Sequence, residues 1–278
     1  MTTQGAVKPK AMIQDNTRCI GCRACMVACQ AWNGLPADQT HFFAGPGYQN
    51  PRDLDANNYT LITFNEITTG ARPNWVFGRQ LCMHCDQPAC ASACPTTALT
   101  KTPLGPVVFN ASRCIGCRAC MQGCPFLIPK YDYENLAPLI HKCTFCADRI
   151  GVGLKPACAT VCPTGAITFG DRDDMVAEAK QRIATAPGRY IPEIYGLDEV
   201  GGTSVLHLSS VPFEQLGYIT GLPKAPMPDL THRWLRVTPH VFIFLYSLFA
   251  MLMWIVGRRN RRHEHADHAG QEHKDHTA

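Results

Sequence analysis

Hydrophobic residues are spread unevenly along the chain, and one apolar segment near its end is much longer than any other. The 21 residues from Val237 to Gly257 include no Asp, Glu, Lys or Arg. A helix of this length spans about 31 Å, which is enough to cross the hydrocarbon core of a bilayer. Arginines flank the segment on both sides, which fits the alternative of a buried core helix poorly. The pattern therefore predicts a transmembrane helix over residues 237–257.

Elsewhere the apolar runs are short, and they predict brief strands together with one helix. Residues 59–64 alternate between polar and apolar side chains, as a strand does. Residues 107–109 and 167–169 are also expected to form short strands. Residues 171–186 begin with acidic side chains and then space their apolar residues at helical intervals, which predicts a helix. Residues 201–208 predict a turn followed by a strand.

The segments on either side of the apolar helix are rich in proline or polar. Residues 223–228 predict a proline-rich linker that leads into the helix. Residues 258–278 are arginine-rich at first and then polar, which favours a solvated, poorly ordered terminus over a metal-binding tail. The histidines of this tail are His263, His265, His268, His273 and His276.

Composition excludes several classes of protein. Of the 278 residues, 46% are hydrophobic and 17% are charged, which excludes wholesale disorder. The net charge of +4 is modest and most basic residues are scattered, so nothing resembles a nucleic-acid-binding stripe. The stretch from Met1 to Arg18 has neither an apolar run nor an Arg-Arg pair, so we expect no secretory leader there.

Cysteine usage is the most informative feature. The 16 cysteines form four groups of four, and none is left over, which indicates four sites with four thiolate ligands each. The groups are Cys19, Cys22, Cys25 and Cys29; Cys82, Cys85, Cys90 and Cys94; Cys114, Cys117, Cys120 and Cys124; and Cys143, Cys146, Cys158 and Cys162.

An internal repeat connects these groups in the order A, B, A, B. Arg18–Met26 and Arg113–Met121 have the same sequence, RCIGCRACM, while Pro95–Thr100 resembles Pro163–Thr168. A duplicated unit explains the order. Taken alone, the repeat favours pairing the first group with the second and the third with the fourth.

The spacing within the groups points to iron–sulfur clusters. Groups one and three follow C-x2-C-x2-C-x3-C, and group three continues with Pro125, as in bacterial ferredoxins that bind [4Fe–4S] clusters. In that pattern three adjacent thiolates hold one cluster and the fourth Cys reaches another. Gly21 and Gly116 lie inside these loops, where we expect a positive φ. Groups two and four contain insertions but keep the final C-x3-C-P unit, whereas group one ends in Cys29-Gln30.

Three other uses of cysteine fit less well. Structural zinc sites are usually built from two separated C-x2-C pairs rather than from triads. Disulfide frameworks suit small secreted domains, and closely spaced triads have poor disulfide geometry. A catalytic thiol is disfavoured because no Cys stands apart from the four groups.

The chain resembles the iron–sulfur electron-transfer subunits of molybdopterin oxidoreductases over roughly residues 15–257. Within that family it is most similar to the beta subunit of membrane-bound, nitrate-inducible formate dehydrogenase. Val211–Glu214 fit a related family at least as well. This family is the iron–sulfur subunit of membrane-bound uptake nickel–iron hydrogenases. The motifs that carry the resemblance are Cys19–Asn33, Asn50–Leu54, Cys82–Cys85, Cys124–Phe126, Cys143–Arg149, Gly201–Thr203 and Gly221–Lys224.

The resemblance implies an α+β fold with two ferredoxin-like double-cluster modules, rich in loops, followed by one C-terminal transmembrane helix. It divides the chain into a four-cluster domain (1–170), a helix/strand extension and linker (171–236), the membrane helix (237–257) and a polar His-rich cytoplasmic tail (258–278).

The resemblance also implies four [4Fe–4S] clusters with nested ligand sets, in which groups one and four combine and groups two and three combine. The implied sets are Cys19, Cys22, Cys25 and Cys162 for cluster 1; Cys29, Cys143, Cys146 and Cys158 for cluster 2; Cys82, Cys85, Cys90 and Cys124 for cluster 3; and Cys94, Cys114, Cys117 and Cys120 for cluster 4.

In function, the resemblance implies a non-catalytic subunit that carries electrons from a catalytic molybdopterin subunit to a membrane cytochrome b and quinone. The alternative catalytic partner is the large subunit of a nickel–iron hydrogenase or another molybdenum enzyme. No catalytic residue is expected. His240, at the entrance of the apolar helix, is a candidate haem ligand, although a hydrogen-bonding or interfacial role is the simpler expectation. Trp254 fits an interfacial anchor.

Charge predicts the orientation of the anchor in the inner membrane. Arg258, Arg259, Arg261 and Arg262 follow the helix, against Arg233 and Arg236 before it. The positive-inside rule then places the C-terminus in the cytoplasm and the cluster domain in the periplasm, and a complex that faces the cytoplasm is the alternative. The family resemblance implies that the domain is exported with a partner that carries a twin-Arg signal. A second set of cations lies next to the cysteines, and we expect it either to raise the cluster potentials or to meet solvent or a partner. These cations are Arg18, Arg23, Arg113, Arg118 and Lys142.

Overall fold

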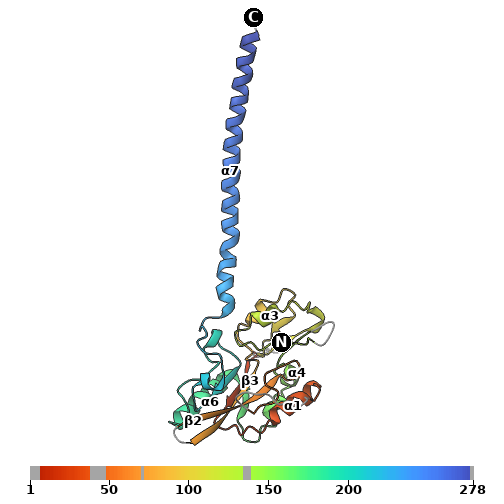
Figure 1. Ribbon diagram of the computed structural model, residues 1–278, viewed down its shortest axis with the longest axis vertical. Coiled ribbons are helices and arrows are strands. Elements are labelled where there is room, and N and C mark those ends of the chain that lie inside the picture. The colour runs from red at the N-terminus through yellow and green to blue at the C-terminus, as the bar shows by residue number, and fades with distance from the viewer. Residues whose placement is uncertain (1–6, 38–47, 70–71, 134–138, 276–278) are drawn as a thin grey trace, which may run out of the picture. The chain divides into compact units, whose positions relative to one another are not determined.

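The computed structural model describes residues 7–37, 48–69, 72–133 and 139–275, with side chains described as far as Arg261. It divides into two compact units, Met1–Pro228 and Asp229–Ala278. The first unit has the α+β, loop-rich character expected from the sequence, with short helices and small sheets (Figure 1).

A three-stranded sheet forms one side of the first unit. Its central strand β1 (Lys10–Asp15) pairs antiparallel with β8 (Ile167–Asp171) and parallel with β9 (Val205–Leu208). Helix α6 (Arg172–Thr185) packs on this sheet. Strands β8 and β9 and helix α6 confirm the expectations for residues 167–169, 201–208 and 171–186, whereas β1 has no counterpart in the sequence-based expectations.

A long hairpin forms the second element of this unit. Strand β2 (Thr60–Thr69) pairs antiparallel with β3 (Arg72–Leu81). The strand expected at residues 59–64 is therefore confirmed, but the observed strand continues to Thr69. Strand β3 was not expected, because Pro73, Gly78 and two arginines interrupt its apolar pattern.

Two smaller hairpins lie close to the cysteine loops. Strand β4 (Leu99–Lys101) pairs with β5 (Val107–Phe109), which confirms the strand expected there, and β6 (Lys130–Tyr131) pairs with β7 (Ile140–His141). The remaining elements of the first unit are short helical segments: α1 (Ala24–Asn33), α2 (Ala89–Ser92), η1 (Ala111–Arg113), α3 (Ala119–Gln122), α4 (Ala147–Gly151), α5 (Ala157–Thr160), η2 (Glu199–Gly201) and η3 (Phe213–Leu216).

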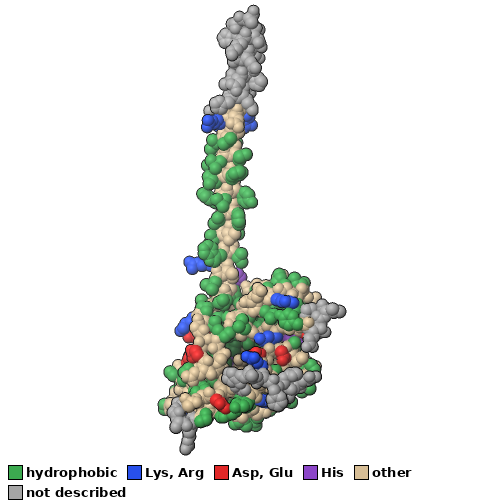
Figure 2. All heavy atoms as spheres, viewed as in Figure 1, with side chains coloured by type: hydrophobic (Ala, Val, Ile, Leu, Met, Phe, Trp, Pro, Cys, Tyr) green, Lys and Arg blue, Asp and Glu red, His purple; other side chains and the backbone are tan. Residues whose placement is uncertain are grey.

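The second unit is one long helix, α7 (Met227–Asp275). Its stretch Met227–Arg261 is apolar and long enough to cross a membrane, and none of the most apolar window is buried. The expected helix over 237–257 lies inside it, and Figure 2 shows hydrophobic side chains along this stretch. The helix begins within the expected linker and is not broken by Pro239 or Gly257.

The helix also continues through most of the expected solvated tail, to Asp275. The expectation of a poorly ordered terminus therefore differs from the structure. The reason is local, because residues 258–275 contain no proline and only one glycine, so nothing in their sequence ends the helix. Four of the tail histidines lie where the structure describes no side chains, and His276 lies outside the described residues.

Candidate metal centres

All 16 cysteines lie in the described part of the first unit, and each is a free thiol. The disulfide framework considered as an alternative is therefore wrong. Among the residues that the structure describes, no group of three or more His, Cys, Asp or Glu side chains converges closely enough to hold a single metal ion.

The two copies of RCIGCRACM form the same local structure. Gly21 and Gly116 have φ values of 68° and 69°, as expected from the sequence, and Arg23 and Arg118 both have φ 62° and ψ 4°. Each Arg is the residue from which a short helix, α1 or α3, begins. The loop at Gly21 is also closely packed, because a Cβ atom there would lie 2.7 Å from the Phe77 ring.

The structure brings group one against group four and group two against group three. Helix α1, which carries Cys25 and Cys29, packs against α5, which carries Cys158. Helix α2, which carries Cys90, packs against α3, which carries Cys120. Helix packing therefore places cysteines of group one near group four and cysteines of group two near group three.

Eight of the cysteines line two small cavities. One cavity is lined by Cys19, Cys22, Cys25 and Cys162, hereafter set 1. The other is lined by Cys94, Cys114, Cys117 and Cys120, hereafter set 4. Each cavity therefore combines three cysteines of one group with one cysteine of another.

The other eight cysteines are close neighbours in two further sets. Burial is the main cause that raises the pKa of Cys85 well above its usual value. The negative charges of Cys82, Cys124 and Cys90 raise it further. Burial is the main cause that raises the pKa of Cys29 to about 12. The negative charges of Cys158 and Cys146 contribute to the same increase. We call Cys29, Cys143, Cys146 and Cys158 set 2, and Cys82, Cys85, Cys90 and Cys124 set 3.

Contacts between the sets give them a linear order. Charge interactions connect Cys25 of set 1 with Cys158 of set 2, and Cys143 of set 2 with Cys82 of set 3. Another interaction connects Cys90 of set 3 with Cys120 of set 4. The order along the molecule is therefore set 1, set 2, set 3, set 4.

Burial differs sharply along this row. Every cysteine of sets 2 and 3 is buried, whereas sets 1 and 4 each contain one exposed, two half-buried and one buried cysteine. The exposed ones are Cys22 and Cys117, at equivalent positions of the repeat. Beside them, Ile20 is 59% exposed and Ile115 is 66% exposed. The two ends of the row are open to contact, and its middle is closed.

Backbone N–H groups point at several sulfur atoms. The N–H of Ala98 donates to Cys94 Sγ at 3.2 Å, and the N–H of Phe145 donates to Cys143 Sγ at 3.3 Å. Burial raises the pKa of Cys94 and Cys162, but hydrogen bonds from the N–H groups and the threonine that follow each Cys-Pro outweigh it, so both pKa values are lowered. Donors of this kind stabilise negatively charged sulfur. In an iron–sulfur cluster, both the cysteine thiolates and the inorganic sulfides carry such charge.

A buried histidine supplies a further donor that sequence reasoning did not single out. His84 lies between Cys82 and Cys85 and is fully buried. Its Nδ1 accepts the N–H of Val107 at 2.9 Å, so Nε2 carries the proton, and Nε2 has no hydrogen-bond partner among the described residues. Its position inside C-x2-C was the only available signal. An orphaned N–H beside set 3 suits a site that holds sulfide acceptors.

The cations named from the sequence have mixed roles. Arg23 is stacked on Phe64 and Arg118 on Tyr131, each with 4.6 Å between the guanidinium carbon and the ring centroid. Arg113 is exposed. Only Lys142 is buried, and its Nζ donates to two backbone carbonyl groups, those of Val107 and Cys143.

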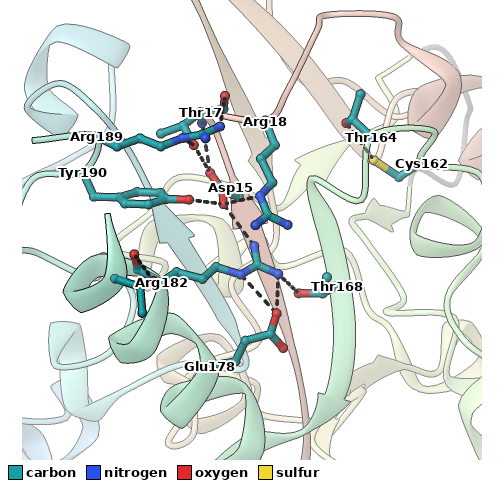
Figure 3. Close-up of polar contacts among 11 residues, drawn as sticks. Asp15, Thr17, Arg18, Cys162, Thr164, Thr168, Glu178, Arg182, Arg189 and Tyr190 are labelled. Atoms are coloured by element: carbon teal, nitrogen blue, oxygen red, sulfur yellow. Dashed lines mark hydrogen bonds and ion pairs between the residues drawn. The ribbon is translucent and has the colours of Figure 1, made fainter. Parts of the chain in front are cut away.

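Arg18 instead belongs to a network that anchors the chain just before set 1 (Figure 3). Its Nε lies 3.4 Å from a carboxylate oxygen of Asp15, a fully buried residue at the end of β1. The same carboxylate accepts hydrogen bonds from Arg182 at 3.0 Å and from the Tyr190 hydroxyl at 2.9 Å. Strand β1, helix α6 and the loop that leads to Cys19 are thereby held together.

Comparisons with known proteins agree with this geometry. Two family models, each of a 4Fe-4S dicluster domain, match residues 18–98 and 73–172. The nitrate-inducible formate dehydrogenase iron-sulfur subunit of Escherichia coli K12 is 39% identical over 222 residues, which are 79% of this chain and 74% of that subunit. The hydrogenase-2 operon protein HybA of Escherichia coli O157:H7 is 33% identical over 95% of this chain and 88% of its own length.

A protein of Nitratidesulfovibrio vulgaris is 43% identical over 83% of this chain, but the match spans only 62% of that longer protein. Two dicluster domains and 16 free cysteines define a carrier of four [4Fe–4S] clusters that transfers electrons. The chain belongs to the family of the formate dehydrogenase iron–sulfur subunits.

Proposed function

We propose that the four sets defined above are the ligand sets of the four clusters, in a row that conducts electrons between two protein partners. The chain then comprises the four-cluster domain (1–170), its extension and linker (171–236), the membrane span (237–257) and the tail (258–278). Each bound cluster supplies one-electron transfer, and the chain itself makes and breaks no substrate bond.

The observation that carries the proposal is the contrast in burial along the row. Electrons must enter and leave a conductor at accessible points, while the middle must be shielded from solvent. Sets 1 and 4 each expose one cysteine beside an exposed isoleucine, and sets 2 and 3 expose none. An accessible cysteine at each end suits the entry of electrons at one end set and their exit at the other.

The protein's own residues have three tasks in this function. Short helices such as α1 and α5 hold adjacent sets against each other at a fixed spacing. Backbone N–H groups at Cys94, Cys143 and Cys162 offset the negative charge of the sulfur ligands. Burial of sets 2 and 3 excludes water, which keeps these sites in a medium of low dielectric constant.

The partner that fits best is the catalytic molybdopterin subunit of a formate dehydrogenase, with a membrane cytochrome b and quinone as the acceptor side. Support comes from relatives named as formate dehydrogenase iron–sulfur subunits, which match about four fifths of the chain. The second candidate is a nickel–iron hydrogenase, because the hydrogenase-2 operon protein HybA matches 95% of the chain, a longer stretch than the formate dehydrogenase subunits match.

The location that fits best is the inner membrane, spanned once by α7. Four arginines follow the apolar stretch and two precede it, which favours a cytoplasmic C-terminus and a periplasmic cluster domain. Near one end, Arg258 stacks on Trp254 at 5.1 Å, an arrangement that suits the interface. At the other end, Nδ1 of His240 lies 2.9 Å from the Arg236 carbonyl oxygen, which supports the hydrogen-bonding role.

Purification of the intact membrane complex through a tag on this chain tests the function. We expect one co-purifying molybdopterin subunit, formate-dependent dye reduction and about 16 Fe per copy of this chain. Hydrogen-dependent dye reduction with a nickel–iron subunit would establish the second candidate. A chain that carried iron but co-purified with no oxidoreductase subunit would contradict both. Protease treatment of spheroplasts tests the orientation, because only a periplasmic domain is then digested.

A further inference from the structure

Arg79 on strand β3 is the most completely buried cation in the part of the chain whose side chains the structure describes. Its exposed fraction is 1%. Its Nε donates to the Thr60 hydroxyl at 2.9 Å, and Nη1 lies 3.4 Å from Met12 Sδ. Its backbone is also clamped, because the Tyr218 hydroxyl accepts from the Arg79 N–H and donates to the Arg79 carbonyl, both at 3.0 Å. The side chain is therefore fixed in one place.

No carboxylate compensates this charge among the ion pairs of the described residues, although buried arginines are ordinarily paired. The anionic groups that surround Arg79 are cysteine sulfurs instead. Burial lowers the pKa of Arg79, but the negative charges of Cys158, Cys25 and Cys143 outweigh it and raise that pKa. Met12, which the guanidinium contacts, belongs to the same buried cluster as these three cysteines. A buried cation without a counter-ion is costly, so anionic sulfur must be its partner.

These sulfur atoms belong to two different sets. Cys25 is part of set 1, whereas Cys158 and Cys143 are part of set 2. Arg79 also acts electrostatically on Cys19 of set 1 and on Cys29 of set 2. The guanidinium thus lies at the boundary between the two sets, on the step that an electron takes from one to the other.

We propose that Arg79 is a positioning residue that holds the reduction potentials of clusters 1 and 2 high and close together. The proposal rests on the ligand sets proposed above. Each reduction adds one electron and hence one negative charge to a cluster. A fixed positive charge beside both sets favours the reduced form of each, and it acts strongly because water is excluded. A shared cation also limits the difference in potential between the two clusters.

Arg23 provides a matched comparison. It is half-buried and lines the cavity of set 1, but its guanidinium stacks on Phe64 and donates to the carbonyl of Tyr48 at an exposed position. Solvent partly screens a charge in this position. Removal of Arg23 should therefore change the potential of cluster 1 less than removal of Arg79 does, and it should leave that of cluster 2 unchanged.

The test is a redox titration of the intact complex followed by EPR, with iron and sulfide content measured in parallel. In Arg79→Met and Arg79→Gln, we expect clusters 1 and 2 to become harder to reduce by at least tenfold in the equilibrium constant, which is about 59 mV for one electron. Arg79→Lys keeps the charge, so its potentials should shift less than those of the two neutral variants. Arg23→Gln should shift the potential of cluster 1 by less than tenfold and keep that of cluster 2 within twofold of the wild type. The potentials of clusters 3 and 4 should stay within twofold of the wild type in every variant.

Two outcomes would overturn the proposal. One is unchanged potentials of clusters 1 and 2 in a neutral variant that retains full iron. If the neutral variants lose their clusters, Arg79→Lys decides, because a shift of tenfold or more in a variant that keeps both the charge and full iron would refute the proposal. Neither outcome affects the proposed function, which is tested on the wild-type complex by its cluster content and its co-purifying partner.

Discussion

The two outer cysteine sets differ from the two inner sets in what surrounds their sulfur atoms. Sets 1 and 4 are built largely from the two copies of RCIGCRACM, lie at the ends of the row and expose Cys22 and Cys117. Sets 2 and 3 combine more distant cysteines and are buried throughout. The comparison shows that the two loops of identical sequence leave a cysteine accessible at each end, whereas the sets built from more distant cysteines are enclosed by the rest of the chain.

The two halves of the row also differ in their buried cations. Arg79 is buried near sulfur atoms of sets 1 and 2, whereas Lys142, which acts electrostatically on Cys90 of set 3, donates to two carbonyl groups. The sequence repeat extends to neither residue. Equivalent clusters in the two halves therefore occupy different electrostatic environments, which is what a conductor needs if its clusters are to differ in potential.

Removal of a cysteine should have the largest effect, and the effect should differ between the middle and the ends. Cys143→Ala opens a hole among fully buried sulfurs, so we expect loss of clusters 2 and 3 and failure of the complex to assemble. Cys22→Ser changes an exposed ligand, so the complex should form and retain about three quarters of its iron or more. Iron analysis of the purified complexes measures both. Equal losses would contradict the distinction between inner and outer sets.

The next largest effect concerns the anchor of set 1. Asp15→Ala removes the buried carboxylate that Arg182, Tyr190 and Arg18 share, and should lower the free energy of unfolding by about 3 kcal/mol. Asp198→Ala is the control, because its ion pair with Lys224 is exposed and should contribute at most about 1 kcal/mol. Denaturant-induced bleaching of the cluster absorbance compares the two. A loss as small in Asp15→Ala as in the control would show that the network is not an anchor.

A glycine substitution tests the packing of the outer loop. Gly21→Ala meets both a positive φ and the Phe77 ring, and should destabilise the loop by about 2 kcal/mol or more. Gly153→Ala also has a positive φ but meets no atom within 4 Å, so only the backbone cost of about 1 kcal/mol applies. The rate of iron loss to a chelator should rise more in the first variant. The reverse order would contradict the close packing at Gly21.

The smallest expected effect is a pH dependence of the interior. Burial, assisted by Arg79, lowers the pKa of His207 to about 3. In the unfolded chain this His titrates near pH 6.5, so the unfolded state binds more protons as the pH falls below about 6.5. Stability should then decrease by up to about 1.4 kcal/mol per pH unit, and His207→Gln should reduce this slope between pH 7.5 and 5.5. An unchanged slope in the variant would show that His207 is not the group responsible.

Features that follow from residues close in sequence could be predicted. They are the cysteine groups, the positive φ of Gly21 and Gly116, helix α6 and the apolar part of α7. The nested arrangement could not be derived from the repeat, since it depends on α1 meeting α5 across more than a hundred residues, and only the family resemblance implied it. Arg79 escaped notice because it is far in sequence from Cys25 and Cys158 and lies on a strand whose Pro73 and Gly78 hide its pattern. Burial, which distinguishes Arg79 from Arg23, is a property of the folded chain alone.

The central claim is that sixteen thiols hold four iron–sulfur clusters in one row with open ends and a closed middle. Iron and acid-labile sulfide, measured on the complex purified without air, test it most directly. The account predicts about 16 of each per chain, together with the brown colour of reduced and oxidised clusters. A colourless preparation, or one in which zinc replaces iron at the cysteines, would contradict it.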